Sequence, residues 1–227
     1  DPMKLATWNV NSLNVRLPQV LKWLEENPID VLCIQETKLT DDKFPVAAIE
    51  AAGYHVAYTG QKTYNGVAIL SKYPILDVVK NNPRFEDEQQ RIIAATIEGV
   101  RFVCAYIPNG QTVDSDKYVY KLAWLKALHE WLAAEMRQYP QLALLGDYNI
   151  APEDRDVYDP ESWHEQVLCS TPERAAFQRL IALGLSDSFR LFNQVPCQAF
   201  TWKALSYLRI NAAHTTLRSF AIPLSPI

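Results

Sequence analysis

The chain has 227 residues, of which 48% are hydrophobic and 21% charged; this balance excludes a disordered chain and can build one large core. The net charge of -4 excludes a uniformly basic surface, so binding of nucleic acid would have to rest on a local patch. No run approaches the roughly 18 apolar residues of a membrane span, so no membrane association is expected.

Short apolar runs, several of them rich in β-branched residues, predict the strands. They cover residues 4–8, 31–34, 66–71, 92–97, 101–107 and 142–145. Several are apolar without alternation, which indicates strands buried on both faces. The segment IEGVR at 97–101 is a tight connection and predicts an antiparallel hairpin.

Helical patterns separate these runs. They cover residues 17–27, 44–52, 116–137 and 172–183. In the first, Pro18 is placed near the helix start, and the second ends ahead of Gly53. Strands that alternate with helices predict a layered α/β fold.

The four cysteines are Cys33, Cys104, Cys169 and Cys197. They contain no CxxC pair and no secretory leader is recognised ahead of them, so we expect reduced thiols and a cytoplasmic protein. Cys33 and Cys104 lie in apolar runs and are expected in the core.

Polar side chains that can bind metal or phosphate follow four of the expected strands. They are Asn9, Asn11, Glu36, Tyr106, Asn109, Asp147 and Asn149. Each has an ordinary structural alternative: the first two asparagines could close a turn, Glu36 could be a surface acid, Asp147 could cap a helix, and Tyr106 could be an amphipathic strand residue. Their coincidence at strand ends favours a functional site, because sites in layered α/β folds are assembled there.

Six segments together resemble a known family. They are WNVNSLNVR at 8–16, IQETK at 34–38, YNGVAILSK at 64–72, QRIIAAT at 90–96, YIPNG at 106–110 and LLGDYNIAP at 144–152. In this order they are similar to the motifs of the exonuclease III type of apurinic/apyrimidinic endonuclease, within the endonuclease/exonuclease/phosphatase superfamily. The resemblance runs from Met3 to about Trp202 and implies a four-layered αββα sandwich.

The resemblance also implies a chemistry for the strand ends. It assigns a Mg²⁺ ion, replaceable by Mn²⁺, to Asn9, Glu36, Asp147 and Asn149. It assigns catalysis to Tyr106, Asp147 and Asn149: Asp147 would orient the attacking water or handle the leaving-group proton, and the other two would stabilise the phosphate. Mg²⁺ prefers oxygen ligands with one or two carboxylates, and fixed donors aimed at developing charge are a large catalytic term.

DNA contacts are implied for Asn11, Arg91, Asn109, Lys117 and Trp202. Arg91 could instead form a structural ion pair with the acids of EDEQQR, and Trp202 could be an ordinary core aromatic. Asp187 is expected to be structural.

After Trp202 the sequence departs from the family. Residues 188–227 contain no Asp or Glu but four cationic side chains, and the family's terminal Asp-His has no matching position. We therefore expect a domain over 3–202 and a divergent tail over 203–227, which is truncated, shifted in reading frame or a natural variant.

The implied function is a Mg²⁺-dependent DNA repair nuclease, acting as a monomer on double-stranded DNA. It would cleave 5′ to abasic sites and remove 3′-terminal nucleotides or blocking groups. Two alternatives stay open: a catalytically impaired binder of abasic DNA that lacks the Asp-His pair, and a superfamily phosphatase or phosphodiesterase with a non-DNA substrate.

Overall fold

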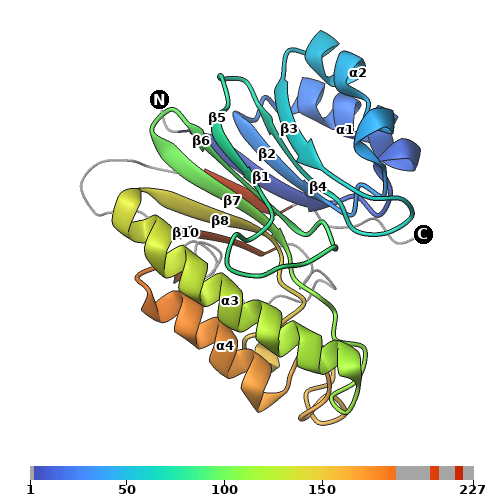
Figure 1. Ribbon diagram of the computed structural model, residues 1–227. Helices are drawn as coiled ribbons and strands as arrows, with labels where there is room; N and C mark the ends of the chain where they lie inside the picture. The colour runs from blue at the N-terminus through green and yellow to red at the C-terminus, as the bar shows by residue number, and fades with distance from the viewer. Residues whose placement is uncertain (1–2, 188–204, 210–217, 222–227) are drawn as a thin grey trace.

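The computed structural model describes residues 3–187, 205–209 and 218–221, the last two ranges by their backbone. The strands of the described residues form two mixed sheets (Figure 1). The first sheet, in the order β11-β1-β2-β4-β3, comprises β1 (Lys4–Asn9), β2 (Val31–Gln35), β3 (His55–Thr59), β4 (Val67–Ser71) and β11 (Arg218–Ala221). The second, in the order β5-β6-β7-β8-β10-β9, comprises β5 (Leu76–Lys80), β6 (Ile92–Ile97), β7 (Val100–Tyr106), β8 (Leu142–Asp147), β9 (Ser186–Asp187) and β10 (Leu205–Arg209).

Helices cover the outer face of each sheet (Figure 1). The described helices are α1 (Leu13–Glu26), α2 (Val46–Ala51), α3 (Asp116–Gln138) and α4 (Thr171–Ala182), with the 3₁₀ turns Asp41–Lys43 and Asp154–Asp156. The first two pack on the first sheet, and α3 and α4 pack on the second. The predicted α/β class is confirmed as two mixed sheets flanked by helices.

Strand β7 shows why the apolar runs lack alternation. Val103 and Ala105 point toward α3 and α4, whereas Phe102 and Cys104 belong to the cluster between the two sheets. Both faces of the strand are therefore buried, and each face needs apolar side chains. Cys33 and Cys104 both lie in this inter-sheet core, as expected.

The hairpin predicted at 97–101 is confirmed, because β6 and β7 pair antiparallel from Ile97 and Val100 outward. Its two turn residues, Glu98 and Gly99, have φ of 49° and 77°. Two positive φ values are typical of a type I′ turn, whose twist matches that of the paired strands.

Several features of the fold differ from the sequence-based predictions. The predicted strands do not include β3, β5, β9, β10 and β11; β5 is mostly exposed and so lacks an apolar run. The first helix begins at Leu13, which places Pro18 inside it and not near its start. The early start lets Leu13 be buried against the first sheet. This burial offsets the loss of the backbone hydrogen bond that Pro18, which has no N–H, cannot donate inside the helix.

A close approach between β7 and β8 requires a glycine just before Asp147. A Cβ atom built on Gly146 would lie 1.8 Å from the carbonyl oxygen of Ala105, the residue that pairs with it on β7. The glycine that interrupts the run LALLGD therefore allows β8 to pair fully with β7 up to its last residue.

Strands β10 and β11 bring two short segments of the expected tail into the sheets. The backbone of β10 pairs antiparallel with β8, and that of β11 pairs parallel with β1. The expected boundary at Trp202 lies outside the described residues. Of the helices in the described ranges, none combines the length and the apolar character needed to cross a bilayer.

Candidate active site

The ends of four strands converge at one edge of the two sheets. In the first sheet β1 and β2 are parallel, and Asn9 pairs with Gln35, the residue before Glu36. In the second sheet β7 and β8 are parallel, and Tyr106 pairs with Asp147. Because the sheets pack face to face, these two parallel pairs deliver their last residues to the same place.

Asn9 connects the two carboxylates of this site. Its Nδ2 lies 2.8 Å from Oε1 of Glu36 and 2.8 Å from Oδ2 of Asp147. Its Oδ1 accepts a hydrogen bond of 3.0 Å from the backbone N–H of Asn11. The amide thus neutralises part of the repulsion between two acids that belong to different sheets.

Asn149 ties the end of β8 to the end of β7. Its backbone N–H donates to Oδ1 of Asp147 at 3.1 Å, and its side-chain Nδ2 donates to the carbonyl oxygen of Ile107 at 2.8 Å. Both Asp147 and Asn149 are buried. The side chains of this corner are therefore held in place before any substrate arrives.

Several residues of the site adopt left-handed backbone conformations without being glycine. Asn11, Glu36 and Asn149 have φ of 44°, 56° and 46°. Such conformations cost about 1–3 kcal/mol each and tend to occur at functional sites, where surrounding contacts enforce them. Their concentration at this edge agrees with a site whose side-chain directions are set by the loops.

Tyr106 is a neutral hydrogen-bonding group of the site. Burial raises the pKa of its phenol, and the nearby Glu36 carboxylate raises it further, while Arg91 opposes this rise. The guanidinium carbon of Arg91 lies 4.7 Å from the centre of the tyrosine ring, and its Nη1 donates to the Tyr106 carbonyl at 3.1 Å. Arg91 therefore packs against Tyr106. In the described part of the chain it forms no ion pair with the acids of EDEQQR.

Lys38 also belongs to the site, although it is not among the site residues predicted from sequence. Its Nζ lies 3.5 Å from Oε2 of Glu36 and donates to Oδ1 of Asn11 at 2.7 Å. The structure thus places Asn11 on the rim, next to a cation that also faces Glu36. The lysine of the IQETK motif was the available signal.

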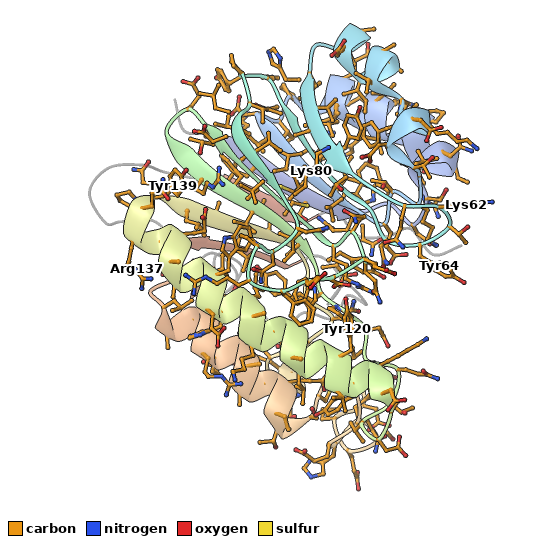
Figure 2. The ribbon with its side chains drawn as sticks, viewed as in Figure 1. Lys62, Tyr64, Lys80, Tyr120, Arg137 and Tyr139 are labelled. Carbon is orange, nitrogen blue, oxygen red and sulfur yellow. The ribbon has the colours of Figure 1, made fainter. Side chains whose placement is uncertain are left out.

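A cavity of about 520 Å³ opens beside Tyr106. It is lined by Gln61, Tyr64, Asn65, Gln89, Arg91, Tyr106, Pro108, Asn109, Gly110, Gln111, Lys117 and Tyr120. Three of the five expected DNA contacts, Arg91, Asn109 and Lys117, lie on its wall. Figure 2 shows Tyr64 on the loop between β3 and β4 and Tyr120 on α3; neither was identified from sequence. Of the other two expected contacts, Asn11 lies outside the cavity lining, beside Lys38, and Trp202 lies outside the described residues.

A chain of hydrogen bonds fixes Arg91 in the cavity wall. The Tyr120 hydroxyl donates to Oδ2 of Asp87, whose Oδ1 accepts from the backbone N–H of Gln89 at 2.9 Å. The side-chain oxygen of Gln89 then accepts from Nε of Arg91 at 2.8 Å. Residues that are far apart in sequence thereby orient one cationic group.

The donor set fits a magnesium ion. Among the described residues no group of three or more His, Cys, Asp and Glu side chains gathers that could hold a metal ion by such ligands alone. Two carboxylates, Glu36 and Asp147, accompanied by the amides of Asn9 and Asn149, match the preference of Mg²⁺ for one or two carboxylates plus water and substrate oxygens.

Comparison with known proteins places this arrangement in a family. Residues 6–199 match the model of the endonuclease/exonuclease/phosphatase family. The chain is 34% identical over 212 residues to exodeoxyribonuclease III of Haemophilus influenzae, covering 88% of this chain and 79% of that protein.

Solved structures show the same relationship. A 3′ phosphatase from Neisseria, bound to a product DNA hairpin, superposes with a TM-score of 0.86 at 46% identity, covering 89% of this chain and 84% of that one. An AP endonuclease from Archaeoglobus fulgidus has a TM-score of 0.82 at 35% identity, covering 90% and 85% of the two chains. The chain therefore belongs to the exonuclease III and AP endonuclease branch of the endonuclease/exonuclease/phosphatase family.

Proposed function

We propose that this protein is a Mg²⁺-dependent hydrolase of DNA phosphoesters that processes 3′ ends. The observation that carries the proposal is the Asn9-bridged pair of Glu36 and Asp147, which lies close to Tyr106. Tyr106 in turn lines a cavity with the cationic side chains of Arg91 and Lys117. Paired carboxylates can hold a divalent cation and activate water, and neighbouring cations can hold a phosphate.

Each group at the strand ends takes the role that the family resemblance implies for it. Glu36 and Asp147 would hold Mg²⁺ with the amide oxygens of Asn9 and Asn149, and the bound ion would polarise the phosphoryl oxygen. Asp147 orients the attacking water or handles the leaving-group proton. Tyr106, whose phenol keeps its proton, donates a hydrogen bond to the phosphate.

The substrate class follows from the relatives and from the cavity. The 46% identical Neisseria protein is described as a 3′ phosphatase and a 3′-5′ exonuclease. The cavity beside Tyr106 offers amides, aromatic rings and two cations, Arg91 and Lys117, which suits a nucleotide with its phosphate. We therefore infer that 3′-phosphate groups and 3′-terminal nucleotides of double-stranded DNA are the substrates.

Cleavage of the phosphodiester 5′ to an abasic site is a second candidate. It is favoured by the 35% identity to the Archaeoglobus fulgidus AP endonuclease and by the fold that the two proteins share. Both activities use the same hydrolytic groups, so only the substrate distinguishes them.

Three labelled duplexes test these proposals. One carries a recessed 3′-phosphate, the second a recessed 3′-hydroxyl, and the third a single tetrahydrofuran abasic analogue. Each is incubated with the chain in Mg²⁺ and in EDTA. We expect metal-dependent release of phosphate from the first and shortening of the second, and cleavage of the third if the second candidate is also correct.

The variant Asp147→Asn is the matched control, because it keeps the shape of the site and should abolish every product. Products that persist in this variant would indicate a contaminating nuclease. Tight binding of all three duplexes with no product in Mg²⁺ would contradict the proposal and favour a binder without turnover, the alternative suggested by the missing Asp-His pair.

A further inference from the structure

Lys121 is a fully buried lysine that none of the roles above uses. It lies on α3, and its exposed fraction is 0%. Its Nζ donates to the carbonyl oxygen of Asn109 at 3.1 Å, to that of Asn149 at 2.6 Å, and to Oε1 of Glu173. An ammonium has three N–H donors, so these contacts use all of them.

Glu173, the partner of Lys121, is equally buried and fully hydrogen-bonded. It lies in the first turn of α4, where its Oε1 also accepts from the backbone N–H of Leu168 at 3.0 Å. Its Oε2 accepts from the backbone N–H and the hydroxyl of Ser170 at 3.2 and 2.6 Å. The carboxylate is therefore a fixed anchor for the lysine.

The other two acceptors of Lys121 belong to the candidate active site. Asn109 is on the loop that follows β7 and Tyr106, and Asn149 is on the loop that follows β8 and Asp147. The loop at Gly110 also packs tightly on the lysine stem, since a Cβ built there would lie 3.0 Å from Cδ of Lys121. One side chain thus connects both loops to two helices.

We propose that Lys121, anchored by Glu173, is a positioning residue that holds the Asn109 and Asn149 loops in the geometry needed for hydrolysis. This inference rests on the proposed function and deepens it. The lysine touches carbonyl oxygens of the loops and acts on the substrate only through them.

The location of the pair favours this role over a contribution to stability alone. A buried ion pair is weak evidence for stability, because a well-packed apolar pair of similar volume is often as stabilising. The apolar core around α3 and α4 could be filled in that way. Only the ammonium, however, offers donors to two loop carbonyls at once.

Three variants separate positioning from stability. Lys121→Met removes the donors and leaves the Glu173 carboxylate buried without its partner. The double variant Lys121→Met/Glu173→Gln also removes that charge. The matched control is Arg101→Met/Glu135→Gln, which breaks the ion pair between the buried Arg101 and the half-buried Glu135, with Nε and Oε2 2.8 Å apart. Arg101 contacts Asp77 and Thr96 and no residue of the candidate site.

Four quantities are measured for each variant. They are the melting temperature, kcat on the duplexes described above, the Kd for the same duplexes in EDTA, and hydrogen exchange of peptides spanning residues 106–112 and 146–152. We expect Lys121→Met to melt well below the wild type and the double variant to recover most of that loss. In the double variant kcat should stay about 10- to 100-fold low, the cost of a misplaced catalytic group, while Kd is unchanged.

Hydrogen exchange should be faster in both loops of the double variant and unchanged in the loops of the Arg101 control. Wild-type kcat in a double variant that has regained its melting temperature would overturn the inference, as would a kcat loss no larger than that of the control. If the wild-type chain hydrolyses none of the duplexes, the proposed function fails, and the exchange data still decide this inference: unchanged exchange in both loops refutes it.

Discussion

The side-chain amide of Asn9 lies 2.8 Å from Oδ2 of Asp147, although 138 residues separate the two in sequence and they belong to different sheets. The same Nδ2 is shared with Glu36. Two acids that would otherwise repel each other are thus held together by one neutral donor. This pairing makes the candidate site a property of both sheets at once.

Replacing Asn9 with alanine should lower kcat/KM on the 3′-phosphate duplex by about 100-fold, the usual effect of losing one aligned donor in an active site. Without the amide, Glu36 and Asp147 lose their common donor and repel each other. Steady-state kinetics at saturating Mg²⁺ measure the effect. Asn14→Ala, an exposed asparagine at the start of α1, is the control and should behave as the wild type. Near-normal turnover in Asn9→Ala would show that the bridge is dispensable.

Replacing Lys117 with alanine should weaken binding of duplex DNA uniformly across sequences. Lys117 lies on the cavity wall, where it can contact a phosphate. Its loss should therefore reduce by about 1 the magnitude of the negative slope of the logarithm of the association constant against the logarithm of the salt concentration. Fluorescence anisotropy in EDTA at several salt concentrations measures this slope. Lys126→Ala removes an exposed lysine from the same helix outside the cavity, and its slope should not change. Equal slopes in the two variants would show that Lys117 does not contact the DNA backbone.

The Tyr120–Asp87 hydrogen bond should make stability depend on pH in the alkaline range. Burial and the bond to Asp87 raise the pKa of the Tyr120 phenol, so the unfolded chain loses this proton before the folded one. The corresponding stability is fully present below about pH 10 and is lost as the pH rises further. Urea unfolding of the wild type should therefore show a steeper fall in unfolding free energy above pH 10 than Tyr120→Phe.

The control for this measurement is Tyr158→Phe, because the Tyr158 side chain belongs to a residue that is 93% exposed. That variant should retain the steep alkaline fall of the wild type. An identical pH dependence in Tyr120→Phe and the wild type would mean that the Tyr120 proton is not linked to folding.

Replacing Gly146 with alanine should destabilise the fold by about 3 kcal/mol, as expected for forced overpacking. The new methyl group would collide with the Ala105 carbonyl and push β8 away from β7 just before Asp147. Gly53→Ala is the comparison, because a Cβ built there meets nothing within 4 Å and only its φ of 91° disfavours alanine. Denaturation midpoints should therefore fall further for Gly146→Ala; equal losses would mean that the sheet adjusts easily.

The strand ends could be predicted from sequence because each apolar run stops at a polar residue. The motifs that contain these residues also occur in the same order as in a known family. Periodicity also identified the helices that pack on the two sheets. The burial of Lys121, however, could not be predicted from the stripe of leucines on α3. Lys121 lies one helical turn before Trp124 and Leu125, and a lysine on an apolar face is normally expected to reach solvent.

The class of fold, the family and the residue types at the ends of β1, β2, β7 and β8 could all be predicted from the sequence. These depend on local patterns, on burial of both strand faces and on motif order. Three contacts could be recognised only in the folded chain: Asn9 faces two carboxylates, Tyr120 orients Arg91 through Asp87 and Gln89, and Lys121 joins two loops. Those contacts join residues distant in the chain, and their directions are set by the packing of the sheets and helices, which no local pattern encodes.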